Sequence, residues 1–351
     1  MQGRFHLFDP NPTERLLYLD GWRGLAIISV LIGHFLSRNF PALFVLGGYG
    51  VTLFFVLSGR LMADILFVKR QPIQLFFERR IARIAPALIV LVNYLAIYSI
   101  MWFYWRGTIM MHPWEYFTAL TFTINYAQAY WVGEESRYLA HIWSLCVEEH
   151  CYIALAIIAW LCPRGIFTAK WIISAIACAS LVHSIPLWLA NPGGVHVIYW
   201  RTDVSAAPLL LSAAIFLWLN EDRARSVHVA KVLGAMAPWT MGASLLLFFT
   251  TSNLIHYTVG PVLMALAVNG LDSSPAFFKR MLANPVLRAF GILSYSLYLW
   301  QQPILRYSWR FPPLALLLAA ILMGVVSFFV IERPARRFLN RRPWSRQVEA
   351  S

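Results

Sequence analysis

The sequence predicts an all-α fold: a polytopic membrane bundle of about ten transmembrane helices, in a single domain over residues 1–351. Hydrophobic residues make up 59% of the 351-residue chain and charged residues 13%, whereas a typical soluble domain is roughly 25% charged. Apolar runs of about 16–22 residues, long enough to cross a bilayer, recur along almost the whole chain. No long polar segment remains to form a soluble domain.

Each apolar run is expected to be a helix, because a helix satisfies its own backbone hydrogen bonds within hydrocarbon. The basic residues at the C-terminal end, about 332–351, are expected to form a cytoplasmic tail. The predicted spans are 22–38, 44–66, 87–105, 142–162, 170–190, 204–220, 230–250, 254–271, 287–307 and 313–331.

The distribution of lysine and arginine predicts the orientation. Ten spans put both termini on one side, and that side carries 21 of the 29 basic residues, against six on the other. The positive-inside rule therefore places both termini in the cytoplasm. Topology and anionic lipid headgroups account for most of the net charge of +13, so no nucleic-acid partner is expected.

The four cysteines all fall in apolar spans, which favours small buried residues over a disulfide framework or a metal cluster. We therefore expect no metal. They are Cys146, Cys151, Cys162 and Cys178.

The first span, "LDGWRGLAIISVLIGHF", carries Asp20 and Arg23 at its mouth and His34 deep inside. Eleven residues separate Arg23 from His34, so the two lie about 20° apart on one helix face and roughly 16 Å apart along the axis. His34 is then expected near or beyond the membrane midplane. A base within the membrane is one interpretation, and a histidine hydrogen-bonded between helices is the other.

The segment "FVKRQPIQLFFERRIARIAP" is interpreted as a basic cytoplasmic loop. Arg80 and Arg83 lie one helical turn apart and could converge on a phosphate group. A basic amphipathic helix on the membrane surface explains the same residues.

The fourth span opens with "HIWSLCVEEHCY", which places two adjacent carboxylates within an apolar run. Glu148 and Glu149 point about 100° apart, so at most one of them faces a given site. We favour a functional role for Glu148, at a depth similar to that of His34, over pairing with a membrane arginine.

The ninth span contains "SYSLYLWQQP", with hydroxyls at Ser294, Tyr295 and Tyr298. A tyrosine within a span usually finds a polar partner. Gln301, near the outer end, could hydrogen-bond a sugar or cap the helix.

Taken together, these motifs resemble the acyltransferase 3 family of integral-membrane acyltransferases, over nearly the whole chain. Arg23 and His34 fit an arginine–ten residues–histidine signature, and Arg80 and Arg83 fit an arginine–two residues–arginine motif. The other matching segments are "FFVLSG", "HIWSLCVEE", "YWRTD" and "SYSLYLW". Gln301 departs from the pattern, because a histidine often occupies its place, and so does Arg60, where an apolar residue is usual.

The resemblance implies transfer of an acyl group, most often acetyl, from acyl-CoA to a hydroxyl of a surface or lipid-linked polysaccharide in the bacterial inner membrane. The expected catalytic residues are His34 as general base, Glu148 as its partner and Tyr298 as the oxyanion donor. Arg23, Arg80, Arg83 and Arg60 are expected to bind the donor. Residues expected to bind the acceptor are Asp20, His141, Arg201, Asp203, Tyr295 and Gln301.

Three alternatives stay open. Arg60 could pair with a terminal carboxylate and favour succinyl-CoA over acetyl-CoA. A transporter or flippase of a lipid-linked glycan could use His34 as a proton relay, although no internal repeat supports this. A structural or sensory membrane protein would leave the loop arginines, Glu148 and His34 without a joint purpose. The expected partners are the bilayer, the carbohydrate and acyl-CoA, and the oligomeric state is left open.

Overall fold

The computed structural model describes residues 14–132, 138–162, 166–221 and 223–340, and these residues form helices and connecting turns without a strand. The predicted all-α membrane bundle is thus confirmed. Eight helical stretches among the described residues are long and apolar enough to cross a membrane. They are Pro41–Val68, Ile73–Arg106, Ala140–Leu161, Ile166–Ala190, Thr202–Glu221, Val227–Thr250, Asn253–Ser273 and Pro313–Leu339.

The other two predicted spans form helices α1 (Glu14–Phe35) and α14 (Pro285–Leu305), of 22 and 21 residues. Each is long enough to cross the hydrocarbon core, at about 1.5 Å per residue. Both carry several polar side chains, and the two helices pack along each other. A Cβ atom added at Gly24 would lie 1.8 Å from the Leu287 carbonyl oxygen, and one added at Gly291 would lie 1.9 Å from that of Asp20. These glycines let the two backbones touch.

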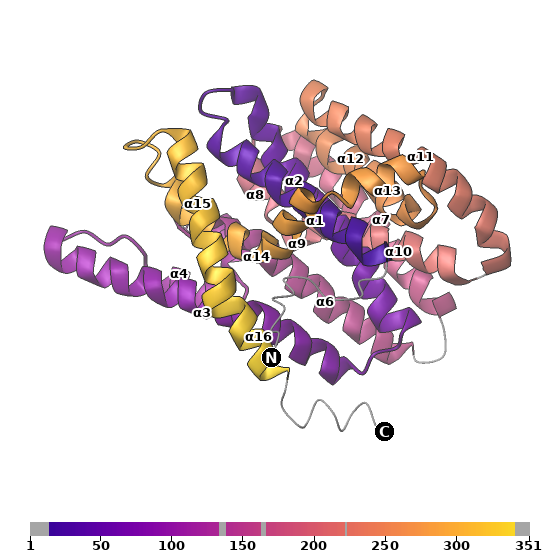
Figure 1. The fold of residues 1–351 in the computed structure, drawn as a ribbon, viewed down its shortest axis with the longest axis horizontal. Helices are drawn as coiled ribbons and strands as arrows, with labels where there is room; N and C mark the ends of the chain where they lie inside the picture. The colour runs from indigo at the N-terminus through magenta and orange to yellow at the C-terminus, as the bar shows by residue number, and fades with distance from the viewer. Residues whose placement is uncertain (1–13, 133–137, 163–165, 222, 341–351) are drawn as a thin grey trace, which may run out of the picture.

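Helix α2 (Val45–Ala63) lies in the middle of the bundle and contacts α1, α6 (Trp143–Leu161), α10 (Ala207–Glu221) and α12 (Asn253–Gly270). Figure 1 shows α11 at one edge and α15 at another. The remaining longer helices are α3 (Ile73–Arg106), α7 (Ile166–Ala190), α11 (Arg223–Thr250) and α15 (Pro313–Ser327). The short helices are α4 (Pro113–Leu120), α5 (Ile124–Tyr126), α8 (Val195–Tyr199), α9 (Thr202–Ser205), α13 (Ala276–Leu282) and α16 (Arg333–Leu339).

The start of the third span was predicted wrongly. Helix α3 begins at Ile73 and runs through Pro86 without a break. The predicted cytoplasmic loop with Arg80 and Arg83 is therefore the first part of a 34-residue helix. Proline is tolerated inside membrane helices because neighbouring groups satisfy the carbonyl that it frees. Arg80 and Arg83 consequently sit on a rigid element.

His34 lies in the last turn of α1, nearer the helix end than the sequence predicts. The helix starts at Glu14, eight residues before the predicted span, and ends at Phe35. Asn39 and Phe40 close the turn with hydrogen bonds to the Leu36 carbonyl, and a 3₁₀ helix (Pro41–Phe44) leads into α2.

The predicted C-terminal tail is partly helical. Helix α15 continues through a π-helical segment (Phe328–Glu332) into α16, which packs against α3. The rest of that tail, residues 341–351, and the N-terminal residues 1–13 lie outside the described residues, so the predicted orientation of the termini stays a prediction.

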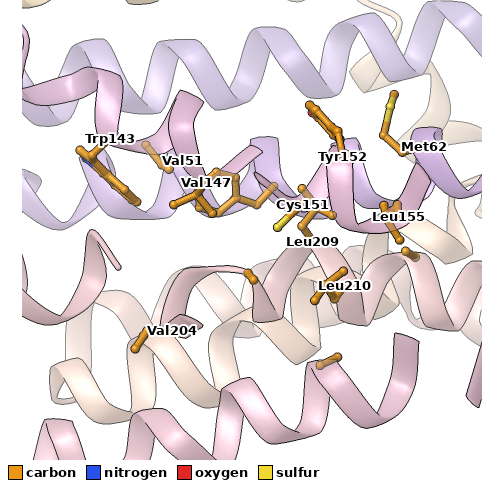
Figure 2. Close-up of a cluster of buried hydrophobic side chains, with 14 of the residues drawn as sticks. Val51, Met62, Trp143, Val147, Cys151, Tyr152, Leu155, Val204, Leu209 and Leu210 are labelled. Carbon is orange, nitrogen blue, oxygen red and sulfur yellow. The ribbon is translucent and has the colours of Figure 1, made fainter. Parts of the chain in front are cut away.

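One part of the core fixes how α6 is rotated. Its buried side chains Val147, Cys151 and Leu155 follow one another at four-residue spacing, and Figure 2 shows them among labelled residues of α2, α9 and α10. Ser144 and Glu148 lie three residues before Val147 and Cys151, so they share the same broad side of α6 as these apolar residues. The packing that fixes the rotation of α6 therefore also fixes the direction of Ser144 and Glu148, which line the cavity described next.

Candidate active site

A cavity of about 100 Å³ lies among α1, α2, α3, α6 and α14. It brings together polar side chains from five segments that are far apart in the sequence. Its polar lining consists of Arg23, Ser58, Arg80, Arg83, Ser144, Glu148, Tyr152, Ser294, Tyr295 and Tyr298. Apolar residues complete the wall: Val51, Phe54, Phe55, Leu57, Leu61, Met62, Ile84 and Leu145.

Two arginines make one end of this cavity strongly positive. Arg23 Nη1 lies 3.0 Å from Asp20 Oδ1, and Arg83 is close enough to Arg23 for their like charges to interact. Among the described residues, the side chain of Arg83 forms no hydrogen bond and no ion pair. Asp20 beside Arg23 and Glu332 within electrostatic reach of Arg83 offset part of this charge, and two neighbouring guanidinium groups suit a phosphate-bearing ligand.

Arg80 is held more firmly than Arg83. Its guanidinium carbon lies 3.5 Å from the centroid of the Tyr152 ring, and its Nη2 lies 3.3 Å from Glu149 Oε1. The two adjacent glutamates thus have different surroundings: Glu149 pairs with Arg80, and Glu148 lines the cavity and accepts a 2.8 Å hydrogen bond from Ser58 Oγ. The alternative interpretation of Glu148 is pairing with a membrane arginine. In the structure it is the neighbouring Glu149 that forms this pair.

Tyr298 borders the cavity and connects it to a second polar group. The Tyr298 hydroxyl donates to the backbone carbonyl of His141 at 2.6 Å and lies 2.6 Å from Ser144 Oγ. The rings of His141 and Tyr298 have centroids 5.3 Å apart. The His141 carbonyl accepts the hydrogen bond that the Tyr298 hydroxyl donates. Tyr298 must therefore break this bond before it can donate to an oxyanion.

His34 lies beyond Tyr298 and does not line the cavity. Its Nδ1 is 2.6 Å from Oε1 of Gln301, one turn past Tyr298 on α14. The sequence predicts Glu148 as the partner of His34. In the structure the hydrogen-bond partner of His34 is Gln301 instead, and Glu148 does not contact His34. His141 is near enough to His34 to interact electrostatically. Within the described part of the chain, the two buried ring nitrogens of His141 have no well-aligned hydrogen-bond partner, although the Leu299 backbone is nearby.

Arg60 is placed away from the cavity. Its side chain is 1% exposed, and its Nη2 lies 2.6 Å from Asp272 Oδ1. Its Nη1 donates to the Val268 carbonyl, and Tyr18 donates to Asp272 at 2.6 Å. Arg60 follows Ser58 by two residues, about 200° around α2, so it faces the opposite side of the helix. The expectation that Arg60 lines the donor channel does not fit this position.

Arg201 and Asp203 lie near a second cavity, of about 390 Å³. Its polar lining consists of His150, Ser180, His183, Thr202 and Asp203, and the rest is apolar. Arg201 Nε lies 3.1 Å from Asp203 Oδ1, and Arg201 Nη2 lies 2.5 Å from Asp203 Oδ2. His183 Nε2 lies 2.9 Å from Asp203 Oδ2. The structure therefore keeps this pair together but separate from the first cavity.

Tyr295 lines the first cavity, and its hydroxyl donates to the Ile84 carbonyl at 2.7 Å. Asp20 stays beside Arg23 at the positive end. The described residues contain no group of three or more histidine, cysteine or acidic side chains that could hold a metal ion.

Several residues in or near this site could not be identified from the sequence, among them Ser144, Ser58 and Arg336. Ser144 and Ser58 are single serines in apolar helices, and only the four-residue spacing from Ser144 to Glu148 hints at the first of them. Arg336 of α16 is exposed and lies near enough to Arg83 to interact with it. Nothing in the basic C-terminal sequence distinguishes Arg336 from its neighbours.

Comparison with known proteins identifies the family of the chain. The profile of the acyltransferase domain family matches residues 16–331. The O-acetyltransferase OatA of Staphylococcus aureus, in strains NCTC 8325 / PS 47 and COL, is 25% identical over 358 aligned residues, which cover 91% of this chain and 57% of the relative. The chain thus spans a little over half the length of these relatives. No solved structure matches it. Since the family profile covers most of the sequence, the chain belongs to the acyltransferase 3 family.

Proposed function

We propose that the protein is a membrane O-acetyltransferase that moves the acetyl group of acetyl-CoA to a hydroxyl of a surface or lipid-linked polysaccharide. Family membership and the O-acetyltransferase relatives support the reaction class. The observation that carries the proposal is the cavity with Arg23 and Arg83 at one end and Tyr298 bordering it, with His34 just beyond. This arrangement suits a donor with an anionic end and a reactive end.

The donor's phosphates bind at the positive end. Arg83 meets them first, since its side chain forms no hydrogen bond or ion pair among the described residues, and Arg23 and Arg80 add charge from α1 and α3. The apolar wall accommodates the pantetheine arm. Glu148, held by Ser58, accepts a hydrogen bond from one of the arm's amide N–H groups.

His34 acts as the general base. It takes the proton of the acceptor hydroxyl while that oxygen attacks the thioester carbonyl, and the tetrahedral intermediate then expels the CoA thiolate. The protonated imidazole returns its proton to the leaving sulfur, so the base is regenerated. Tyr298 stabilises the intermediate's oxyanion once its hydroxyl turns from the His141 carbonyl.

The acceptor approaches from the end of α1 that carries His34, opposite the arginines. His141, whose ring nitrogens have no well-aligned hydrogen-bond partner among the described residues, lies on this side and contributes hydrogen bonds to the sugar. The Arg201–Asp203 pair contributes more remotely, as part of the second cavity. We place the protein in the bacterial inner membrane, with the arginine end on the cytoplasmic side, where acyl-CoA is made.

The donor's acyl group is acetyl. The charge of Arg60 is matched by Asp272, so it offers no free cation to the carboxylate of succinyl-CoA. Among the described residues that line the cavity, the cations are Arg23, Arg80 and Arg83, which are assigned to the donor's phosphates.

The test is a transfer assay on the purified protein in lipid nanodiscs. With [¹⁴C]acetyl-CoA and bacterial polysaccharide fractions, hydrolysis to acetate and transfer to glycan are scored separately. Acetyl esters on glycan that depend on His34 support the proposal. Absence of both reactions, with glycan moved across a vesicle membrane, overturns it in favour of a flippase. Mass spectrometry of surface polysaccharide from a deletion strain then identifies the acceptor.

A further inference from the structure

We infer that Gln301 is a positioning residue that fixes the tautomer of His34 and directs its Nε2 toward the acceptor. This inference rests on the proposed function in one respect, the role of His34 as base. It concerns a residue that sequence reasoning assigned to sugar binding or helix capping.

The geometry of the pair carries the inference. Gln301 is 0% exposed, and its Oε1 lies 2.6 Å from His34 Nδ1. An amide oxygen only accepts hydrogen bonds, so Nδ1 carries the ring proton and Nε2 keeps its lone pair. The neutral ring can then accept a proton at Nε2 alone.

The surroundings of Nε2 agree with this assignment. Nε2 faces α2 at Gly47, where an added Cβ atom would lie 3.2 Å from it. Because position 47 is glycine, its own side chain does not cover this approach to Nε2, which we assign to the acceptor hydroxyl. His141 also lies within electrostatic reach of His34 and is itself influenced by Arg306.

Gln301 offers a second group. Its Nε2 meets no hydrogen-bond partner within the described part of the chain. One amide can thus hold His34 through its oxygen and donate to the bound sugar through its nitrogen. Substitutions that remove either the amide oxygen or the amide nitrogen distinguish these two contributions of Gln301.

Three variants separate a positioning role from a packing role. Gln301→Met keeps the shape but removes the acceptor, and Gln301→Glu keeps an acceptor at the same length but removes the donor. Gln302→Met, at the neighbouring position, is the matched control. We expect kcat to fall about 10- to 100-fold in Gln301→Met, as for other residues that orient a functional histidine, with KM for acetyl-CoA unchanged. Gln301→Glu should recover at least part of this loss. Equal losses in Gln301→Met and Gln301→Glu would indicate packing and overturn the inference.

A spectroscopic measurement tests the tautomer without any assay of activity. Protein carrying [¹⁵N]histidine is compared with the His34→Ala variant, which identifies the His34 signals. Wild type should show a protonated Nδ1 and an unprotonated Nε2, and Gln301→Met should show a changed tautomer ratio. A protonated Nε2 in wild type overturns the inference even if acetyl transfer is observed. If transfer is absent but the tautomer is as expected, the proposed function fails and the positioning of His34 by Gln301 stands.

Discussion

The hydroxyl of Tyr298 donates to the backbone carbonyl of His141 across a distance of 2.6 Å, and this contact joins α14 to the start of α6. Tyr298 borders the arginine-lined cavity on one side, and Gln301, one turn further along α14, holds His34. A single helix therefore links the donor end of the site to its base.

Replacing His34 by alanine is expected to lower acetyl transfer by about 10²- to 10⁴-fold, which is the usual contribution of a general base. Binding of acetyl-CoA should persist, because Arg23, Arg80 and Arg83, the arginines proposed to bind its phosphates, line the cavity whereas His34 does not. Transfer is measured with labelled donor, and CoA binding by calorimetry on the same preparation. A well-folded variant with wild-type turnover would refute the assignment.

Replacing Tyr298 by phenylalanine is expected to lower both kcat and stability. The change leaves the His141 carbonyl and the Ser144 hydroxyl with one partner fewer in a buried place, and an unsatisfied buried polar group costs about 1–3 kcal/mol. Ser144→Ala removes one of the same hydrogen bonds and is the control for stability alone. If Tyr298→Phe and Ser144→Ala have the same kcat, Tyr298 does not stabilise the oxyanion.

Arg83 and Arg80 are expected to respond differently to alanine substitution. Arg83→Ala should raise KM for acetyl-CoA with little change in kcat or thermal stability, because the side chain makes no ion pair among the described residues. Arg80→Ala should also lower the melting temperature, since it leaves Glu149 without its 3.3 Å partner. Steady-state kinetics at two salt concentrations and a melting curve measure both effects. An unchanged KM for acetyl-CoA in Arg83→Ala would show that the donor's phosphates do not bind at this end of the cavity.

Arg336 is expected to contribute to donor binding from α16. Arg336→Ala should raise KM for acetyl-CoA a few-fold, about the value of one exposed charge contact, and the effect should shrink at high salt. Arg337→Ala, the adjacent and equally exposed position, serves as the control. Equal effects of the two substitutions would show only a general loss of positive charge.

Arg60→Leu is expected to destabilise the fold without altering the choice of donor. Removing the buried guanidinium breaks the ion pair with Asp272, but Asp272 is 45% exposed, so the loss should fall below the ~3–5 kcal/mol of a fully buried pair. The ratio of kcat/KM for acetyl-CoA and succinyl-CoA should stay at its wild-type value. A changed ratio would return Arg60 to the donor site.

Hydrophobic run length was enough to predict the all-helical membrane fold, because bilayer thickness sets the length of a span. Spacing also correctly indicated that only one of the two adjacent glutamates would face a site. It could not show that Arg60 turns away toward Asp272, because its partner is 212 positions distant in the chain. The same holds for Gln301 and His34, 267 positions apart. Such pairs depend on helix packing, which the sequence pattern of one helix does not determine.

The glycine contacts between α1 and α14 have a mechanical consequence. With the two backbones touching at Gly24 and Gly291, no side chain is left between them to rearrange and let the helices slide. Arg23, His34, Tyr298 and Gln301 are therefore mounted on one stiff pair of helices. For the proposed reaction, we therefore expect any opening of the site to come from movement of the surrounding helices, such as α3 and α16, while the groups on α1 and α14 keep their spacing.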